Sequence, residues 1–205
     1  MLIVRSSGVR QAEVRRESRE TKIYVSLTLM PGSIKVSTPV KFLNHMLETL
    51  IFYMNASAEV IAEDLRGFDD HHVVEDVFIA LGTAIDRALG DRVGIRRFGW
   101  SMVPMDDALA LTAVDLGGRA YWVFRGGSFI GGERIGDLTT QMIPHIIRTL
   151  AIHSRATIHA EIRWGGENDH HMAEALFKSL GGMSMAMAME YIDNTVRSLK
   201  GGTMQ

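Results

Sequence analysis

The 205-residue chain has no cysteine, no excess of charge of one sign and no long apolar run. Without cysteine it can form neither a disulfide nor a thiolate metal site. With 22 basic and 24 acidic side chains, its net charge of −2 does not indicate nucleic acid as a partner, although a local basic cluster can still bind an anion. No apolar stretch approaches the roughly 20 residues of a transmembrane helix, and the N-terminus lacks the apolar core of a signal peptide. These absences favour a soluble, cytoplasmic protein without a membrane partner.

The length and composition are typical of one domain or two small ones. Apolar residues make up 46% of the chain and charged residues 22%, as in a globular protein with a buried core. An internal repeat of about 100 residues divides the chain into two similar halves, residues 1–93 and 94–205. Because each half is short for a core of its own, we expect the halves to form one fused unit.

The repeat is clearest in a histidine-rich motif. Residues 69–76 read DDHHVVED and residues 168–175 read NDHHMAEA, so that His71 and His170 lie 99 positions apart. The copies keep matching downstream at the same offset: Phe78 with Phe177, and Leu81-Gly82 with Leu180-Gly181. Six of the eight histidines form two matched sets of three, because a further histidine stands 26 residues upstream in each half: His45 before His71, and His145 before His171.

Each histidine pair opens a predicted helix, because apolar residues follow it at helical spacing. On such a helix His71 and Glu75 are four residues apart and share a face, and His170 and Glu174 do the same. An imidazole nitrogen and a carboxylate oxygen on adjacent turns can hold one divalent cation between them.

The second histidine of each pair, His72 or His171, projects about 100° further round the helix and more easily reaches a different ion. The geometry therefore favours two metal ions over one. A donor set of imidazoles with one carboxylate and no thiolate suits Mn, Fe, Co, Ni or Zn better than Ca or Mg. The symmetry of the repeat predicts two equivalent sites, each with three histidines and one glutamate.

Hydrophobic periodicity and turn residues predict the remaining elements. The predicted strands cover residues 9–16, 20–29, 34–37, 58–62, 109–116, 120–124 and 157–163. The predicted helices cover residues 42–51, residues 71–89, residues 138–152 and a stretch after His170. Asp70 and Asp169 stand where helix N-caps are expected. The glycine-rich residues 126–136 indicate a connection.

Several conspicuous residues have plainer interpretations. The methionines at 183, 185, 187 and 189 are typical of core or interface packing. His153 and His159 have no equivalent in the first half and are expected to be structural. Glu20, at the start of a predicted strand, is by itself typical of a solvated edge charge. The tail at residues 197–202 is either a frayed terminus or a phosphate clamp that orders on binding.

Taken together, these segments resemble the imidazoleglycerol-phosphate dehydratase family over nearly the whole chain. The matching segments are FLNHML at 42–47, DDHHVVED at 69–76, GIRRFG at 94–99, PMDDAL at 104–109 and ENDHHMAEA at 167–175. The doubled histidine motif in this setting is highly specific. The terminal Ser198-Leu199-Lys200-Gly201 resembles the family's phosphate-binding end.

The resemblance implies an α+β fold of two similar half-domains from an internal duplication, each a small mixed or antiparallel sheet backed by helices, as in the ribosomal protein S5 domain 2-like fold. It also implies a carbon–oxygen lyase of histidine biosynthesis, which removes water from imidazole glycerol phosphate to give imidazole acetol phosphate. The implied partners are that phosphorylated substrate and other copies of the chain, in a 24-mer built from trimers with active sites at subunit interfaces.

The resemblance further implies two Mn²⁺ ions per active site, with ligands carried over residue by residue. One ion takes His71, Glu75, His145 and His171, and the other takes His45, His72, His170 and Glu174. Substrate-contacting positions are His45, Arg97, Arg119, Lys178, Ser198 and Lys200. Glu20 corresponds to the family's acid/base carboxylate and also contacts substrate, and the implied catalytic set adds His71, Glu75, His170 and Glu174.

The chain departs from the family pattern at four places, none of which removes a proposed ligand. Asn44 and Pro144 replace acidic residues that precede His45 and His145 in the family. The segment 159–170 is one residue longer than is common, and Leu199 separates the terminal serine from the lysine. The two replacements bear on groups that orient the histidine ligands.

The implied reaction explains the need for such a site. The proton to be lost is on a carbon without an adjacent carbonyl, so only the imidazole ring can take up the electron density. Two cations flanking the ring can hold it as an imidazolate and lead to a diazafulvene-like intermediate. Glu20 or a metal-bound water then moves the proton.

Two other functions remain open from the residues alone. A dinuclear metal hydrolase places its ions about 3.5–4 Å apart with a bridging ligand, whereas each predicted set here has one carboxylate and no obvious bridge. A metal-binding structural or storage assembly would need metal for oligomerisation but would not need the cations Arg97, Arg119 and Lys200.

Overall fold

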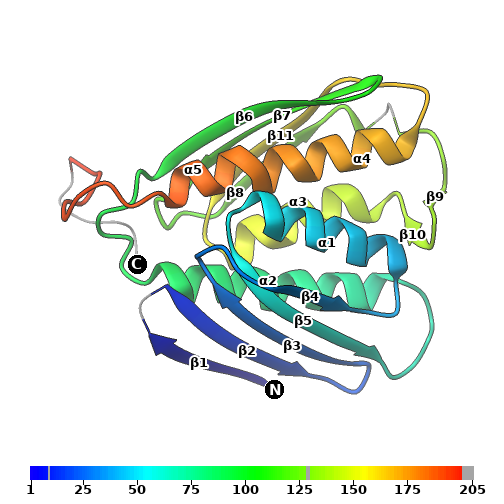
Figure 1. The fold of residues 1–205 in the computed structure, drawn as a ribbon. Helices are drawn as coiled ribbons and strands as arrows, with labels where there is room; N and C mark the ends of the chain where they lie inside the picture. The colour runs from blue at the N-terminus through cyan, green and yellow to red at the C-terminus, as the bar shows by residue number, and fades with distance from the viewer. Residues whose placement is uncertain (9, 128–129, 200–205) are drawn as a thin grey trace.

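The computed structural model describes residues 1–8, 10–127 and 130–199, in which a layer of helices lies between two sheets (Figure 1). The first sheet has the strand order β1-β2-β3-β5-β4. Its strands are β1 (Leu2–Gly8), β2 (Gln11–Glu17), β3 (Thr21–Thr28), β4 (Ile34–Ser37) and β5 (Ser57–Asp64). In β3 the alternate residues Ile23, Val25 and Leu27 are buried against the helices, as their period of two predicts.

The second sheet repeats the topology of the first. Its order is β6-β7-β11-β8, from strands β6 (Phe98–Met105), β7 (Ala108–Asp115), β8 (Tyr121–Arg125) and β11 (Thr157–Trp164). In each sheet a hairpin is followed by a strand that pairs antiparallel on one side and parallel on the other: β5 between β3 and β4, and β11 between β7 and β8. The predicted α+β fold with an internal duplication is confirmed. A two-stranded ribbon, β9 (Arg134–Ile135) with β10 (Leu138–Thr139), completes the strands of the described chain.

The helices bury their apolar faces against both sheets and against each other. They are α1 (Lys41–Tyr53), α2 (His71–Leu89), α3 (Met142–His153), α4 (Asp169–Phe177), the π-helix η2 (Lys178–Met185) and α5 (Ala186–Met189). Helix α2 packs on β2, β3 and α3, and α4 with η2 packs on β6, β7 and α1. The equivalent residues Phe78 and Phe177 meet in the core with ring centroids 6.4 Å apart. This shared core makes the two halves one unit.

Matched glycines allow the helices of each half to approach closely. A Cβ at Gly82 of α2 would lie 2.8 Å from the Cβ of His153 at the end of α3. A Cβ at Gly181 of η2 would lie 2.2 Å from the carbonyl oxygen of Leu50 in α1. Side chains at these two positions would push α3 from α2 and α1 from η2, so the repeated Leu-Gly pair sets the spacing of the helices that carry the histidines.

The junction between the predicted halves is tied together by Arg92, whose side chain is buried. Its guanidinium donates to the carbonyl oxygens of Leu116 (2.8 Å) and Ser154 (2.9 Å) and to the carboxylate of Asp86. One side chain thus links the end of α2 to the ends of β7 and α3.

Several features of the secondary structure were not predicted correctly, among them both strands of the β9–β10 ribbon. Strand β1 was missed, and β6 was missed because its apolar pattern is inverted: Trp100 and Met102 face solvent, whereas Ser101 is buried and donates to the carbonyl oxygen of Ser179 at 2.8 Å. The helix predicted over residues 138–152 begins only at Met142, after β10. Pro144 then falls in the first turn, where a helix tolerates proline.

Of the described methionine side chains in this run, Met185 and Met189 are buried, as core packing predicts, and Met187 is half-buried. Among the described residues, no helix is both long enough and apolar enough to cross a bilayer.

Candidate functional site

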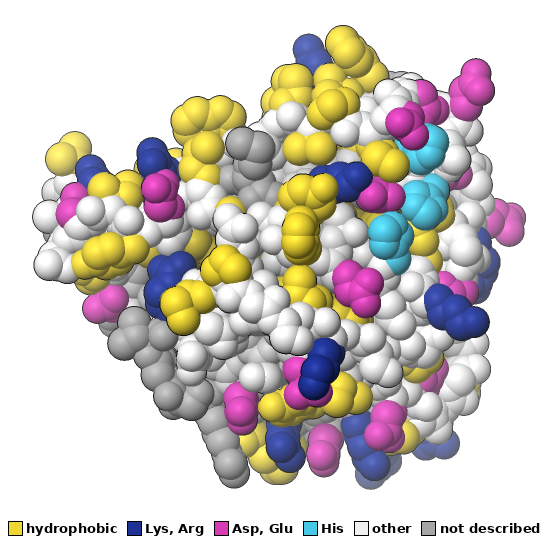
Figure 2. Space-filling model, in the orientation of Figure 1, with side chains coloured by type: hydrophobic (Ala, Val, Ile, Leu, Met, Phe, Trp, Pro, Cys, Tyr) yellow, Lys and Arg dark blue, Asp and Glu magenta, His cyan; other side chains and the backbone are white. Residues whose placement is uncertain are grey.

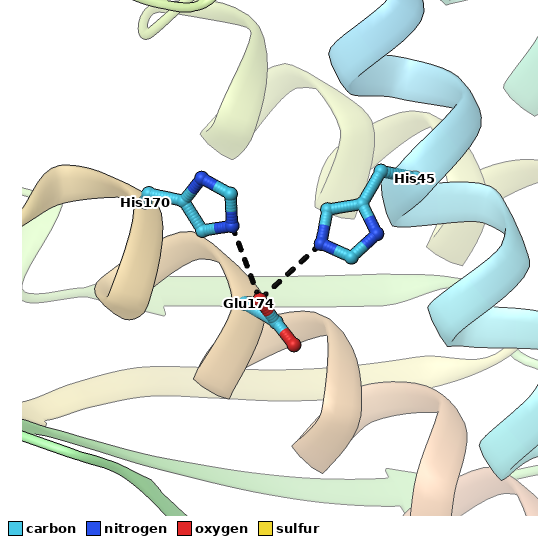
Figure 3. A group of neighbouring side chains, drawn as sticks. All are labelled: His45, His170 and Glu174. Carbon is cyan, nitrogen blue, oxygen red and sulfur yellow. Dashed lines mark hydrogen bonds and ion pairs between the residues drawn. The ribbon is translucent and has the colours of Figure 1, made fainter.

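The first group of candidate ligands joins α1 to α4. His45 comes from α1, and His170 and Glu174 come from α4 (Figure 3). Oε2 of Glu174 lies 3.3 Å from Nε2 of His45 and 3.1 Å from Nε2 of His170. One ligand atom from each residue lies within 4.8 Å of the others, so the three can converge on one cation.

The second group repeats this arrangement between α2 and α3. His71 and Glu75 come from α2 and His145 from α3. Nε2 of His145 lies 2.9 Å from Oε1 of Glu75, and the rings of His71 and His145 have centroids 4.9 Å apart. Both groups are half-buried, as ligands open to a substrate must be. Two imidazoles and one carboxylate fit a divalent transition metal in each group.

The second histidine of each pair lies outside its own chain's groups. Nδ1 of His171 lies 2.6 Å from Oδ1 of Asp107, and Nδ1 of His72 lies 3.3 Å from Oε2 of Glu20. Within one chain the structure therefore assembles three of the four ligands predicted for each ion. The angle of about 100° between neighbouring residues on a helix turns the fourth away.

Helix α2 starts at His71 as expected, whereas α4 starts one residue earlier, at Asp169. Asp69 and Asn168 accept the backbone N–H groups of His71 and His170, each at 2.9 Å. Asp70 is the N-cap of α2 by position, as predicted, but makes no side-chain capping hydrogen bond, whereas the N-cap of α4 is Asn168 and the prediction of Asp169 is wrong. The carboxylates of both aspartates face the chain segment that precedes α3. That of Asp70 accepts from the hydroxyl and the backbone N–H of Thr139, and that of Asp169 accepts from the backbone N–H groups of Gly131 and Gly132.

Lys178 makes the two candidate ligand groups electrostatically different. Its Nζ lies 2.8 Å from Oε1 of Glu174, whereas Ile79 stands at the equivalent position after Glu75. Partial burial opposes the ionisation of Glu174, but the hydrogen bonds from Lys178 and His45 outweigh it, so that its pKa is lowered. Lys178 was predicted to bind substrate, and within the chain it pairs with a candidate metal ligand.

A cavity of about 420 Å³ opens beside the first group. It is lined by Ile34, His45, Glu48, Thr49, Phe52, Tyr53, Glu174 and Lys178. Figure 2 shows histidine side chains on the surface over α1 and α4, next to acidic and basic side chains. The candidate ligands are thus reachable from solvent, and one wall of the cavity is apolar enough to take a heteroaromatic ring.

The predicted phosphate-binding cations lie elsewhere in the chain. The Arg97 guanidinium contacts Asp115 at 2.7 and 3.0 Å and donates to the carbonyl oxygen of Arg197 at 2.8 Å. The Asp115 contact raises the pKa of Arg97. Arg119 is exposed in the turn after β7, and Ser198 lies in the tail beside Arg197. Lys200 lies outside the described residues.

These cations and the candidate metal ligands are at opposite ends of the chain's fold. The backbone N–H of Arg97 donates to the carbonyl oxygen of Ala188, and the helical segment from Glu174 to Ala188 is roughly 20 Å long. Likewise β7, with its eight residues, separates Asp107 from Asp115 by about 27 Å. One small phosphorylated molecule cannot touch both sets of residues of the same chain.

The remaining histidines are outside both groups. His153 is half-buried, and burial lowers its pKa, as suits a structural side chain. His159 is exposed on the outer face of β11. Asp107 was missed as a site residue, although it lies in the PMDDAL segment. The hydrogen bond to His171 and then that from the Glu167 backbone lower its pKa. Asp107 stands directly before β7, as Glu20 stands directly before β3, and this equivalence within the repeat is the feature that indicates Asp107.

Comparison with known proteins supports the geometry. Residues 38–184 match the family model described as imidazoleglycerol-phosphate dehydratase. The enzyme of that name from Caldivirga maquilingensis is 58% identical over 94% of this chain and 98% of its own length. That from Saccharolobus islandicus is 46% identical over the same shares.

Two crystal structures of such dehydratases share the fold. The Staphylococcus aureus enzyme has a TM-score of 0.77 and 31% identity, covering 87% of this chain and 98% of its own. The Pyrococcus furiosus enzyme in complex with (S)-C348 has a TM-score of 0.76 and 32% identity, covering 92% and 99%. The chain therefore belongs to the imidazoleglycerol-phosphate dehydratase family, whose members are metal-dependent hydro-lyases (EC 4.2.1.19).

Proposed function

We propose that this protein removes water from imidazole glycerol phosphate to give imidazole acetol phosphate, as a cytoplasmic enzyme of histidine biosynthesis. The observation that carries the proposal is the pair of equivalent half-buried groups, His45–His170–Glu174 and His71–Glu75–His145. Membership of the dehydratase family supports it independently. We further propose that Mn²⁺ is the resident ion, with two ions per active site.

The chemistry of the substrate explains why the residues have different proposed roles. The His45–His170–Glu174 and His71–Glu75–His145 groups would hold two cations, which would supply Lewis acidity to the imidazole ring; the electrons of the ring must expel the hydroxyl because no carbonyl is adjacent. In this proposal His45 contacts the substrate from the wall of the cavity, and Glu20 takes the proton from the carbon. Arg97, Arg119, Ser198 and Lys200 bind the phosphate, remote from the reacting carbons, and so supply binding energy that orients the substrate.

The active site is proposed to be completed by neighbouring subunits. His72 and His171 point away from their own chain's groups, so each is available to a group of another chain. The separation of roughly 20 Å between Arg97 and Glu174 along the helical segment leads to the same arrangement. A closed homo-oligomer, a 24-mer built from trimers, satisfies both requirements in every copy.

The alternative of a bridged dinuclear hydrolase is less well supported. Among the described residues, the two groups share no carboxylate and are carried by different helix pairs. Ions bound there have no bridging side chain of the same chain.

The test of the proposed function is an anaerobic titration of the metal-free protein with Mn²⁺ in the presence of imidazole glycerol phosphate, following product and particle mass together. We expect imidazole acetol phosphate to form only with metal, and a rise in particle mass to accompany the activity. Metal-dependent assembly without product would indicate a structural or storage protein instead. Activity in fully metal-free protein would contradict the proposed site.

A complementation experiment tests the composite active site. Glu20→Gln and Arg119→Gln are each expected to be nearly inactive, yet after removal of metal, mixing and reassembly with Mn²⁺, about a quarter of the wild-type activity should return, because random pairing restores that share of two-chain sites. The two residues are far apart in one chain. Glu20 precedes the eight-residue strand β3, which is roughly 27 Å long, and Arg10, beyond the other end of β3, donates to the carbonyl oxygen of Met189 at 3.1 Å. Arg97 lies at that end, because its backbone N–H donates to Ala188, and its carbonyl oxygen accepts from Leu116, three residues before Arg119. If both residues served one site from one chain, mixing would restore no activity.

A further inference from the structure

The two hairpins β2–β3 and β6–β7 occupy equivalent places in the two sheets. In each hairpin the last residue of the turn, directly before the second strand, is acidic. Glu20 precedes Thr21, the first residue of β3, and Asp107 precedes Ala108, the first residue of β7. Each carboxylate meets Nδ1 of the second histidine of its own half: Glu20 meets His72 at 3.3 Å, and Asp107 meets His171 at 2.6 Å. The duplication thus extends to a carboxylate–imidazole pair that the histidine motif alone does not contain.

We propose that Asp107 is a positioning residue that holds the His171 imidazole with Nε2 presented to a metal ion in the His71–Glu75–His145 group of another subunit. This inference rests on the proposed function and names a residue that supports that site. An ionised carboxylate only accepts hydrogen bonds, so Nδ1 of His171 carries the proton and donates it to Asp107. Nε2 then keeps its lone pair, which is the form of imidazole that binds a metal.

Asp107 is itself held in place by the loop that leads into α4. Its Oδ2 accepts the backbone N–H of Glu167, and a Cβ at Gly166 would lie 2.0 Å from that oxygen. Gly166 therefore leaves the space that the carboxylate occupies. The hairpin of the second sheet and the start of the motif helix are connected through this one side chain, which fixes the direction of the His171 ring.

The neighbouring Asp106 is not equivalent. Its Oδ2 lies 3.5 Å from Nε2 of His171, and its side chain is 70% exposed, so it can move aside when a metal ion takes Nε2. Glu20 and Asp107 are exposed to a similar extent, but Glu20 differs in its backbone contacts: the backbone N–H of Glu167 donates to Asp107, whereas no backbone N–H in the described part of the chain donates to the Glu20 carboxylate. The duplicated carboxylates have thus diverged, with Asp107 fixed for orientation and Glu20 left able to carry a proton.

The experiment measures Mn²⁺ binding by calorimetry and by electron paramagnetic resonance of the free ion, with Asp107→Asn, Asp107→Glu and the matched control Asp106→Asn. Asp107→Asn is expected to weaken Mn²⁺ binding about 10- to 100-fold, the usual effect of removing a carboxylate that orients a histidine ligand. Asp107→Glu, which places the residue type of the first half at this position, should recover part of the affinity. Asp106→Asn should remain within about threefold of wild type.

A second variant disturbs the carboxylate without changing it. Gly166→Ala pushes on Oδ2 of Asp107 and is expected to weaken Mn²⁺ binding in the same direction as Asp107→Asn. Thermal unfolding of the metal-free proteins separates positioning from folding: the proposal requires weaker metal binding by a variant whose metal-free melting temperature stays close to that of wild type. Lower melting with unchanged Mn²⁺ affinity would show a merely structural role and overturn the inference.

The outcomes also separate this inference from the proposed function. If wild type binds Mn²⁺ and Glu174→Gln does not, while Asp107→Asn and Asp106→Asn both bind as wild type does, the positioning role of Asp107 is wrong and the metal site stands. If wild type binds no Mn²⁺, both proposals fall together.

Discussion

Glu20→Gln is expected to lower kcat by about 10²- to 10⁴-fold, the usual contribution of a positioned acid or base, and to leave KM within about tenfold of wild type. The substitution keeps the size of the side chain and removes its ability to accept a proton. Glu20 is suited to the role because its carboxylate is half-exposed and lies 3.3 Å from Nδ1 of His72, a predicted metal ligand. Steady-state kinetics with imidazole glycerol phosphate at saturating Mn²⁺ measure the effect.

Because Glu20 lies close to His72, the variant can also lose turnover through a displaced metal ligand. The Mn²⁺ concentration distinguishes this explanation from a proton-transfer role. If Glu20 only orients His72, a higher Mn²⁺ concentration should restore turnover of the variant, whereas a proton-transfer role predicts no recovery. Glu17→Gln is the matched control, because Glu17 is an exposed glutamate at the end of β2 in the same hairpin. A Glu20→Gln enzyme with kcat within a few-fold of wild type would reject the acid/base role.

Glu174→Gln is expected to weaken Mn²⁺ binding by more than about 100-fold, since even a carboxylate that only orients a metal ligand is worth 10- to 100-fold. The substitution removes the anionic oxygen that lies between His45 and His170. It also leaves the ammonium of Lys178, 2.8 Å from Glu174 in wild type, without this partner and close to the incoming dication. Activity and assembly should both fail at Mn²⁺ concentrations that saturate wild type.

Because only the group of Glu174 has a neighbouring lysine, we expect the two glutamate substitutions to weaken Mn²⁺ binding to different extents. Glu75→Gln should weaken binding less than Glu174→Gln, because Ile79 replaces the lysine and adds no repulsion. Glu48→Gln is the control: Glu48 lines the same cavity as Glu174 but belongs to neither group. Calorimetric Mn²⁺ titration in which all three variants bind equally well would contradict the assignment of Glu75 and Glu174 as ligands.

Much of the fold could be predicted from local pattern. The alternation in β3 and the apolar stripe of α2 need only their own residues, because backbone geometry fixes periods of two and 3.6. Strand β6 was not predicted because its outward face carries Trp100 and Met102, and its inward face carries Ser101 beneath the π-helix. That inversion depends on Ser179, which is 78 residues away in the chain.

The helix caps show the same limit on a smaller scale. Asp70 holds the N-cap position of α2 without a side-chain capping hydrogen bond, and in α4 the N-cap is Asn168 instead of Asp169. The two aspartates instead bind the backbone of the segment before α3, and no pattern local to the motif indicates that contact.

The sequence by itself determined which residues are candidate metal ligands and that they form two sets, because four-residue spacing on a helix places an imidazole and a carboxylate side by side. Only the tertiary structure decided how the third ligand reaches each set, since His45 lies 129 residues from Glu174 and Glu75 lies 70 residues from His145. These residues, far apart in the sequence, come together because Gly82 and Gly181 let the helices pack tightly around the core of Phe78 and Phe177. The same packing turns His72 and His171 outward and separates the candidate metal ligands from Arg97. Helical periodicity is a local property, whereas the approach of two helices is set by the whole buried core.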